Sequence, residues 1–417
     1  IHTPNPCIYA VFGSYSHIHS PYGDYCGFVI KFIFYKPPHH RKEVIHIMKL
    51  VCSKAELQKS VNIVMKAVPG KTTMPILECI LIDASTNDIK FTANDMELGI
   101  ETRVQGLVLE KGIIALDAKI FSDIVRKLPE NDVTIETDEK LNATITCEKA
   151  RFNIPGKSGE DFSYLPLIEK DEGIRVSQFT LKEMIRQTIF SIAANENNKL
   201  MTGELFQIEN NMLRVVSLDG HRISIRKIPL KDECRDRKVV VPGKTLNEIS
   251  KILSGEMEDM AEIYLSANHI LFEFDDTTVV SRLIEGEYFK IDQMLSSDYE
   301  TKVKINKKEF LDCIDRATLL VKEGEKKPII INIQDGQLEL RIDSQIGSMK
   351  EEIDIEKEGK DIMIGFNPKF LIDALKVIDD EEISIYLMNA KAPCFIRDDA
   401  QQYIYLILPV NFNAVGR

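Results

Sequence analysis

The sequence predicts an α+β protein built from three tandem copies of one domain, each with two helices packed on antiparallel sheets. Two helix-like phrases support this prediction, because each of them occurs three times at intervals of about 125 residues. The first phrase begins at Ser53, Thr180 and Asn306, and the second begins at Asp117, Pro242 and Asn367. Sequence periods of about 20–50 residues indicate solenoids, so a period of domain size indicates whole domains in a row.

Each copy has the order helix, strands, helix, strands. Ser53 with Glu56 three residues later is typical of a capping box at a helix start. Apolar residues then recur at helical spacing at Leu57, Val61, Val64, Met65 and Val68. The Asp-Gly pair at 219–220 predicts a hairpin between strands 213–218 and 223–228. Further strands are expected at 76–82, 89–93, 132–136, 143–147, 261–265, 270–274 and 383–388.

Residues 1–47 differ from the remainder and are predicted to be an extension outside the fold, either disordered or not native to it. They hold six of the eight His and show neither helical nor alternating periodicity. A targeting or tethering arm is the alternative. Their apolar run at 27–35 contains Lys31 and is shorter than the roughly 20 residues that a membrane span needs. The domains are expected at 48–173, 174–299 and 300–417, with polar linkers at 166–177 and 296–304.

The charge of the chain is unevenly distributed. Residues 1–47 hold four basic and two acidic residues, so the net charge of −12 for the whole chain becomes −14 for residues 48–417. Five of the six repeated helices nevertheless carry a net positive charge. Ordinary solvated helix faces would explain any single case. The whole pattern favours a protein that holds a polyanion against its helices through loose contacts with phosphates.

The motifs that resemble catalytic sites are incomplete. Pro-Gly-Lys-Thr at 69–72 and 242–245, and Pro-Gly-Lys-Ser at 155–158, lack the earlier glycine of a phosphate-binding loop. His221 has no Ser or Cys nucleophile patterned with it. Six cysteines of the body stand singly, which is typical of reduced thiols in a cytoplasmic protein. The sequence therefore predicts no catalytic residue, no metal site and no cofactor.

The segment at 217–223 (SLDGHRI) carries a family resemblance. It resembles the T-D-G-H-R-L segment of the bacterial sliding clamps, the β subunits of the replicative DNA polymerase. The loop at 71–77 (KTTMPIL), the strand at 151–154 (RFNI) and the ending at 405–410 (YLILPV) are similar to other segments of that family. The resemblance covers residues 48 to about 412 and leaves residues 1–47 without a counterpart.

The resemblance implies that the three domains form half of a closed ring around duplex DNA. Two subunits would join head to tail, with helices lining the hole and sheets forming the outer wall. Contact with the DNA would be independent of its sequence. The cations expected to face DNA are Lys59, Lys66, Lys71, Arg126, Lys127, Lys182, Arg186, Lys244, Lys251 and Lys369.

The resemblance also implies a pocket for partner peptides between the second and third domains. Its expected residues are Met201, Leu218, Gly220, His221, Arg222, Ile223, Phe289, Gln293, Met294, Ile407, Leu408, Pro409 and Val410. A buried inter-domain core is the alternative for these residues. Phe289 replaces a usual Pro of the family, and Gln293 and Asn411 each replace a usual Arg.

For ring closure, the resemblance pairs Phe152 and Ile154 of the first domain with Leu319 and Leu320 of the third. Lys149 and Arg151 would face acidic groups, of which Glu352 is the clearest counterpart. The predicted function is that of a homodimeric sliding clamp, without catalytic activity, that confers processivity. Its expected partners are the replicative polymerase, the clamp loader and repair polymerases, with no membrane. A phosphate-handling enzyme and a peptide-binding scaffold that never encircles DNA are the rival hypotheses.

Overall fold

The computed structural model describes residues 14–18, 25–29, 47–194, 198–296, 298–322 and 327–412. The chain divides into two units, 1–45 and 46–417. In the first unit, β1 (Ser14–Ile18) pairs with β2 (Tyr25–Val29) in antiparallel register. The sequence did not predict this hairpin, and the rest of residues 1–46 lies outside the described residues. Within the described part of the chain, no helix is both long and apolar enough to cross a membrane.

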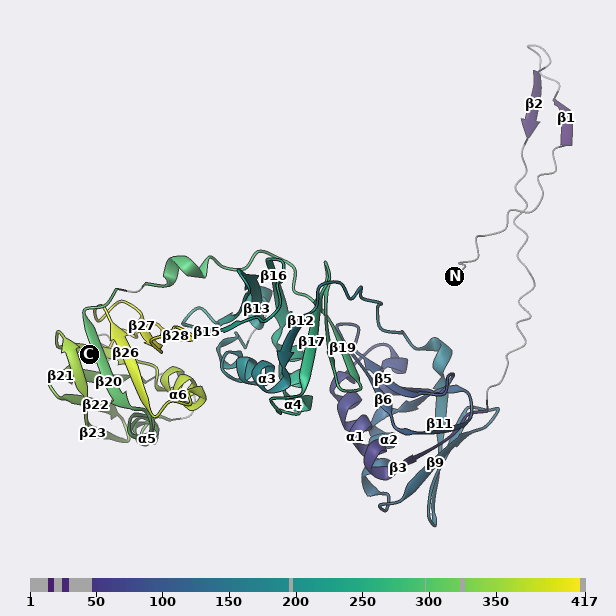
Figure 1. Cartoon of the computed structure of the whole chain (residues 1–417), viewed down its shortest axis with the longest axis horizontal. Helices are drawn as coiled ribbons and strands as arrows, with labels where there is room; N and C mark the ends of the chain where they lie inside the picture. The colour runs from purple at the N-terminus through teal and green to yellow at the C-terminus, as the bar shows by residue number, and fades with distance from the viewer. Residues whose placement is uncertain are drawn as a thin grey trace. The chain divides into compact units, whose positions relative to one another are not determined.

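The second unit contains six α-helices among its described residues, arranged as three packed pairs (Figure 1). These are α1 (Lys54–Val64) with α2 (Ala118–Lys127), α3 (Gln178–Arg186) with α4 (Gly243–Ile252), and α5 (Lys307–Thr318) with α6 (Pro368–Val377). Side-chain caps fix most of the starts, since Ser53, Asp117, Ser177, Asn306 and Asn367 each accept a backbone N–H of the first turn. Each helix therefore lies where a repeated phrase predicted it.

The strands also repeat in three groups. The first repeat holds β3 (Lys49–Ser53), β4 (Cys79–Asp83), β5 (Ile89–Asn94), β6 (Leu98–Val104), β7 (Gly106–Glu110), β8 (Ile113–Asp117), β9 (Asp132–Thr137), β10 (Asn142–Cys147) and β11 (Ala150–Ser158). The second holds β12 (Ile174–Ser177), β13 (Gly203–Glu209), β14 (Met212–Leu218), β15 (Arg222–Pro229), β16 (Arg237–Pro242), β17 (Met260–Leu265), β18 (His269–Phe274) and β19 (Thr277–Arg282). The third holds β20 (Thr301–Asn306), β21 (Ile329–Gln334), β22 (Gln337–Ser344), β23 (Gly347–Asp354), β24 (Glu356–Gly359), β25 (Ile362–Phe366), β26 (Glu382–Leu387), β27 (Cys394–Arg397) and β28 (Tyr403–Ile407).

Antiparallel strand pairs join neighbouring repeats. β19 pairs with β6 through Thr277–Thr102 to Ser281–Leu98, which makes one sheet of repeats 1 and 2. β15 pairs with β28 through Arg222–Ile407 to Arg226–Tyr403, which does the same for repeats 2 and 3. An apolar cluster of both repeats, including Leu218, Ile223 and Leu406, lies at the second junction. These pairings place residues far apart in the sequence side by side.

Several expected boundaries differ from the structure. Residues 75–78 form a 3-10 turn before β4, because Pro75 stands at its first position and lacks the N–H that a ladder requires. The helix expected from Thr180 begins at Gln178 after its Ser177 cap and ends at Arg186, followed by a 3-10 turn at Ile189–Ser191. The ends of both expected linkers are strands, β12 and β20. The predicted α+β class and threefold repeat are confirmed.

Candidate functional site

An apolar pocket of about 470 Å³ lies at the junction of repeats 2 and 3. The residues that line it come from both repeats and from the segment between them. They are Met201, Leu218, Gly220, His221, Arg222, Ile223, Phe289, Met294, Pro393, Leu406 and Leu408. Apolar and Met-containing walls suit a site for short peptides with apolar side chains, since such walls adapt to different occupants.

The turn between β14 and β15 positions the mouth of the pocket. Gly220 has φ +86°, a left-handed conformation that glycine adopts without a steric cost. The Oδ1 atom of Asp219 accepts the backbone N–H groups of His221 at 2.9 Å and of Arg222 at 3.1 Å. The His221 carbonyl in turn accepts the Leu408 N–H at 2.9 Å. The turn of repeat 2 and the C-terminal segment of repeat 3 are thereby held together.

Nine of the thirteen residues expected in the pocket line it in the structure. The other four are Gln293, Ile407, Pro409 and Val410. Gln293 lines an adjacent groove of about 730 Å³, and the Ile407 side chain is buried in the core of repeat 3. The Val410 N–H donates to the Gly365 carbonyl at 2.8 Å, so the chain there runs along β25.

Leu406 and Pro393 line the pocket but were not predicted. Strand periodicity would have indicated the first of them, because successive side chains of a strand point to opposite faces. Leu406 and Leu408 therefore share a face, whereas Ile407 points away from the pocket. Pro393 comes from the loop before β27, and the sequence carries no signal for it.

Seven of the ten cations expected to face DNA are well exposed: Lys59, Lys71, Arg126, Lys127, Lys244, Lys251 and Lys369. Lys66 is partly exposed. Two of them pair with an acidic residue of their own helix, Arg126 with Asp123 at 2.6 Å and Lys251 with Glu248 at 2.7 Å. Such exposed pairs contribute little to stability and can rearrange when a phosphate approaches.

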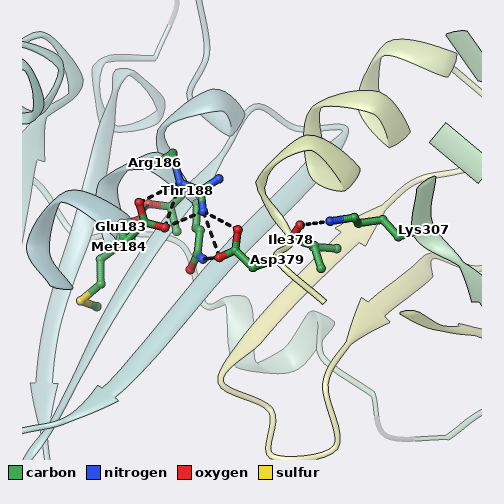
Figure 2. Close-up of polar contacts among 8 residues, drawn as sticks. Glu183, Met184, Arg186, Thr188, Lys307, Ile378 and Asp379 are labelled. Atoms are coloured by element: carbon green, nitrogen blue, oxygen red, sulfur yellow. Dashed lines mark hydrogen bonds and ion pairs between the residues drawn. The ribbon is translucent and has the colours of Figure 1, made fainter. Parts of the chain in front are cut away.

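Lys182 and Arg186 are engaged within the protein. Lys182 donates to the carbonyl of Leu253, the residue that ends α4, at 3.2 Å. Figure 2 shows Arg186 between Glu183 of its own helix and Asp379, which follows α6. Arg186 Nη2 lies 2.5 Å from Glu183 and 3.1 Å from Asp379, and these carboxylates raise the pKa of its guanidinium. Both side chains have structural contacts that the sequence did not reveal.

In each repeat, a lysine of the first helix contacts either the residue that ends the second helix or the segment just after it. Lys54 pairs with Glu130, and Lys182 donates to the Leu253 carbonyl. Lys307 Nζ donates to the Ile378 carbonyl at 2.6 Å (Figure 2). The last carbonyls of a helix have no partner within the helix and carry partial negative charge. Lys182 and Lys307 therefore stabilise their helix pairs through these carbonyls, whereas Lys54 contacts a carboxylate beyond the end of α2.

Two sheet edges carry the residues expected at a dimer interface. Residues 150–155 of β11 pair with β10 on one side, and β8 pairs on the other side only with residues 156–158. Within the described part of the chain, the second side of 150–155 is therefore a sheet edge. β23 is an edge strand of the four-stranded sheet of repeat 3. Phe152 on β11 is 38% exposed, and Leu319 beside α5 is 76% exposed. Ile154 and Leu320 are partly buried, whereas Lys149 and Arg151 are exposed.

Acidic residues gather close to β23. Glu309, Asp312, Glu351, Glu352 and Asp354 line a cavity of about 310 Å³ together with Arg316. Glu352 pairs with Lys350 at 3.1 Å, and Glu351 pairs with Arg316. The hydrogen bond from Arg316 lowers the pKa of Glu351, which keeps that carboxylate charged. The sequence identified Glu352 alone, although Glu351 and Asp354 lie on the same strand, and Glu309 and Asp312 come from α5.

Comparison with known proteins identifies the family of the chain. Models of the N-terminal, central and C-terminal domains of the DNA polymerase III beta subunit match residues 48–166, 175–290 and 292–411. The chain belongs to this family of bacterial sliding clamps. The predicted family and its clamp function are confirmed.

Individual clamps show how close the similarity is. The beta sliding clamp of Staphylococcus aureus is 34% identical over 360 residues, covering 84% of this chain and 95% of that protein. A DNA polymerase III beta subunit from Eubacterium rectale, known from a crystal structure, is 73% identical with a TM-score of 0.86. The match covers 88% of this chain and 100% of that chain. The DNA polymerase sliding clamp from Bacillus subtilis is 35% identical with a TM-score of 0.85. The match covers 88% of this chain and 99% of that chain.

Proposed function

We propose that two copies of this chain close head to tail into a ring around duplex DNA and tether polymerases to it. The ring acts by topology, without catalysis of its own. The observation that carries this proposal is the apolar pocket at the junction of repeats 2 and 3, where nine residues expected from the clamp resemblance line one cavity. A tether needs such a site on a body that can enclose DNA.

The helices support the contact with DNA. They carry most of the exposed cations that were expected to face it, although residues 48–417 as a whole are acidic. Contacts from scattered lysines and arginines to phosphates are independent of base sequence and weaken as salt rises. A protein that slides requires contacts of this kind, because none of them favours one position on the duplex.

The two sheet edges support closure into a ring. β11 carries an exposed aromatic residue with basic neighbours, and β23 lies beside exposed Leu319 and the acidic cavity. A head-to-tail dimer joins unlike surfaces, so the two edges need opposite charge and compatible apolar groups. The acidic group at β23 is larger than the sequence indicated. It supports an ionic contribution from Lys149 and Arg151 in addition to apolar contact.

The partners proposed for the pocket are short peptides of the replicative polymerase, the clamp loader and repair polymerases. The incomplete phosphate-loop motifs support the absence of catalysis, since 69–72, 155–158 and 242–245 lack the required glycine. A scaffold that binds peptides but never encircles DNA is the remaining alternative. It would share the pocket and would not need the edges of β11 and β23.

Sedimentation at micromolar concentration tests the ring. The unmodified protein is expected to be a dimer, and Phe152→Asp is expected to be a monomer because it buries an unpaired carboxylate at the interface. Phe179→Asp is the matched control, since Phe179 on α3 is a similarly exposed aromatic residue outside the proposed interface. A monomeric unmodified protein, or two variants that sediment alike, would contradict closure through β11.

A further inference from the structure

Arg222 is a charged side chain in the wall of an otherwise apolar pocket. Only 7% of the residue is exposed, so its guanidinium has lost most of its contact with water. A buried guanidinium requires acceptors for its N–H groups, and those acceptors fix its orientation. The geometry of this wall therefore depends on the groups that bind Arg222 from behind.

Three acceptors surround the guanidinium. Nε donates to Asp219 Oδ2 at 3.0 Å, and Nη2 donates to the Phe190 carbonyl at 2.6 Å. Both of these groups belong to repeat 2. Nη1 donates to Asp373 Oδ2 at 2.7 Å, and Asp373 lies on α6 of repeat 3. Arg222 is thus held from both sides of the junction.

Aromatic rings complete this support. The guanidinium carbon lies 4.7 Å from the centre of the Phe370 ring and 5.3 Å from that of Phe190, distances typical of cation–π contacts. The Phe370 ring is also 5.9 Å from the His221 ring. Phe370 therefore touches two pocket residues, and Arg222 lies against two rings.

Asp373 and Phe370 are neighbours on one face of α6, because residues three apart in a helix lie side by side. Neither of them lines the pocket, yet both contact residues that do. The helix itself is fixed at its start, where Asn367 caps the first turn. α6 is thus placed to set the orientation of Arg222 and His221.

We propose that Asp373 and Phe370 are positioning residues for partner capture, which hold Arg222 and His221 in the orientation that a bound peptide meets. This inference rests on the proposed function of the pocket. The ligand class is a short peptide whose apolar side chains enter the cavity, beside a guanidinium that Asp373 keeps oriented. Without Asp373, Arg222 would keep its acceptors from repeat 2 alone.

A purely structural role is the alternative, in which the ion pair joins repeats 2 and 3 and nothing more. The chain offers a matched control, because Arg186 and Asp379 also form an ion pair across this junction. Asp379 contacts α3 rather than the pocket residues (Figure 2). If peptide affinity fell only because the junction loosened, replacing Asp373 and replacing Asp379 would reduce it equally.

The test measures the affinity of a labelled peptide by fluorescence anisotropy, together with thermal unfolding. The probe is the peptide that binds most tightly among overlapping short peptides of the replicative polymerase subunit. Asp373→Asn is expected to weaken binding about tenfold, since the guanidinium loses an ionised acceptor and is left with a neutral amide oxygen. Asp379→Asn is expected to weaken it by less than about twofold, and Asp373→Glu to recover part of the loss.

Phe370→Leu provides a second variant that keeps the charges intact, and it is expected to weaken binding by roughly threefold or more. Equal losses in Asp373→Asn and Asp379→Asn, or unchanged affinity in Asp373→Asn, would overturn the inference while leaving the pocket assignment in place. If no peptide binds the unmodified protein, the pocket assignment in the proposed function fails first and the positioning role fails with it.

Discussion

The junction of repeats 1 and 2 and the junction of repeats 2 and 3 share one construction and differ in what they can bind. Each places a turn before an inter-repeat strand, with an Asp as the first residue of the turn. Asp95 Oδ1 accepts the backbone N–H groups of Glu97 and Leu98, as Asp219 Oδ1 accepts those of His221 and Arg222. The second residue of both turns has positive φ, at Met96 and at Gly220.

The two junctions use ion pairs of opposite polarity. At the first, the turn supplies the acid, Asp95, and the helix of the next repeat supplies the cation, Lys244 on α4. At the second, the strand supplies the cation, Arg222, and the helix supplies the acid, Asp373 on α6. Leu98 stands at the first junction where Arg222 stands at the second, since each residue opens its inter-repeat strand.

The cavities at the two junctions also differ. The first junction has an open groove of about 900 Å³ with charged walls, including Lys90, Arg103 and Glu262. The second has the smaller apolar pocket with one buried guanidinium. Repetition of a domain therefore supplies the strand pairing at both junctions. Gly220, His221 and Arg222 of the turn line the pocket at the second junction, whereas none of residues 95–98 lines the groove at the first.

The largest effect is expected from making the second junction resemble the first with Arg222→Leu. The substitution leaves Asp219 and Asp373 without their buried cation. Removing one partner of a buried pair costs about 3 kcal/mol or more in the free energy of unfolding. Chemical denaturation measures this loss, and peptide binding should fall with it.

Leu98→Met is the matched control at the first junction. It exchanges one buried apolar side chain for another of similar volume, which costs less than about 1.5 kcal/mol. If Arg222→Leu proved as mild as Leu98→Met, the ion pair would not be what distinguishes the two junctions.

The repeat and the helices were predictable from the sequence because their signals are local. Helical spacing and caps such as Ser53 act within a few residues, and the structure has a helix at each repeated phrase. The pocket required the family resemblance, since Met201 and Leu408 meet only after distant strands pair. The roles of Lys182 and Asp373 escaped prediction, because a contact with another helix leaves no periodic trace in the sequence. Leu406 could have been found from strand alternation alone.

A buried acid provides the second contrast between repeats. Glu204 on β13 is 0% exposed and occupies the place that Ile80 occupies on β4, one residue after the strand start. Burial raises the pKa of Glu204 to about 8, against the smaller opposing effect of the Thr188 hydroxyl. Among the described residues neither carboxyl oxygen accepts a hydrogen bond of normal geometry, and the Thr188 hydroxyl donates to the Met184 carbonyl at 2.7 Å.

The stability of the folded chain should therefore fall as pH rises. The folded-state pKa of Glu204 lies above its ordinary value of 4.5, so the unfolded chain releases this proton first. The contribution of protonated Glu204 to the free energy of unfolding is fully present below pH 4.5 and is lost as pH rises through about 8. Within this window the free energy of unfolding should decrease by about 1.4 kcal/mol per pH unit. The nearby Tyr288 stays neutral there, because burial raises its pKa as well.

Glu204→Gln isolates this effect, since it keeps the shape of the side chain and removes the titration. Between about pH 6 and about pH 7.5 the unmodified protein should lose about 2 kcal/mol more than the variant. Thermal or urea unfolding across this range measures the difference. Parallel pH profiles of the two proteins would show that Glu204 does not titrate in this range. Its difference from Ile80 of the first repeat would then have no effect on how stability depends on pH.

The smallest effect is expected from Lys244→Gln at the first junction. Lys244 is largely exposed, so water and salt screen its attraction to Asp95. Asp95 would keep both backbone N–H groups of its turn, at 3.0 and 2.7 Å, and would not become an unpaired buried charge. The loss in the free energy of unfolding should stay below about 1 kcal/mol and vanish in about 1 M salt.

A loss as large as that of Arg222→Leu, or one that salt leaves unchanged, would mean that the polarity of the pair is unimportant. The two junctions would then differ only in the apolar residues around them.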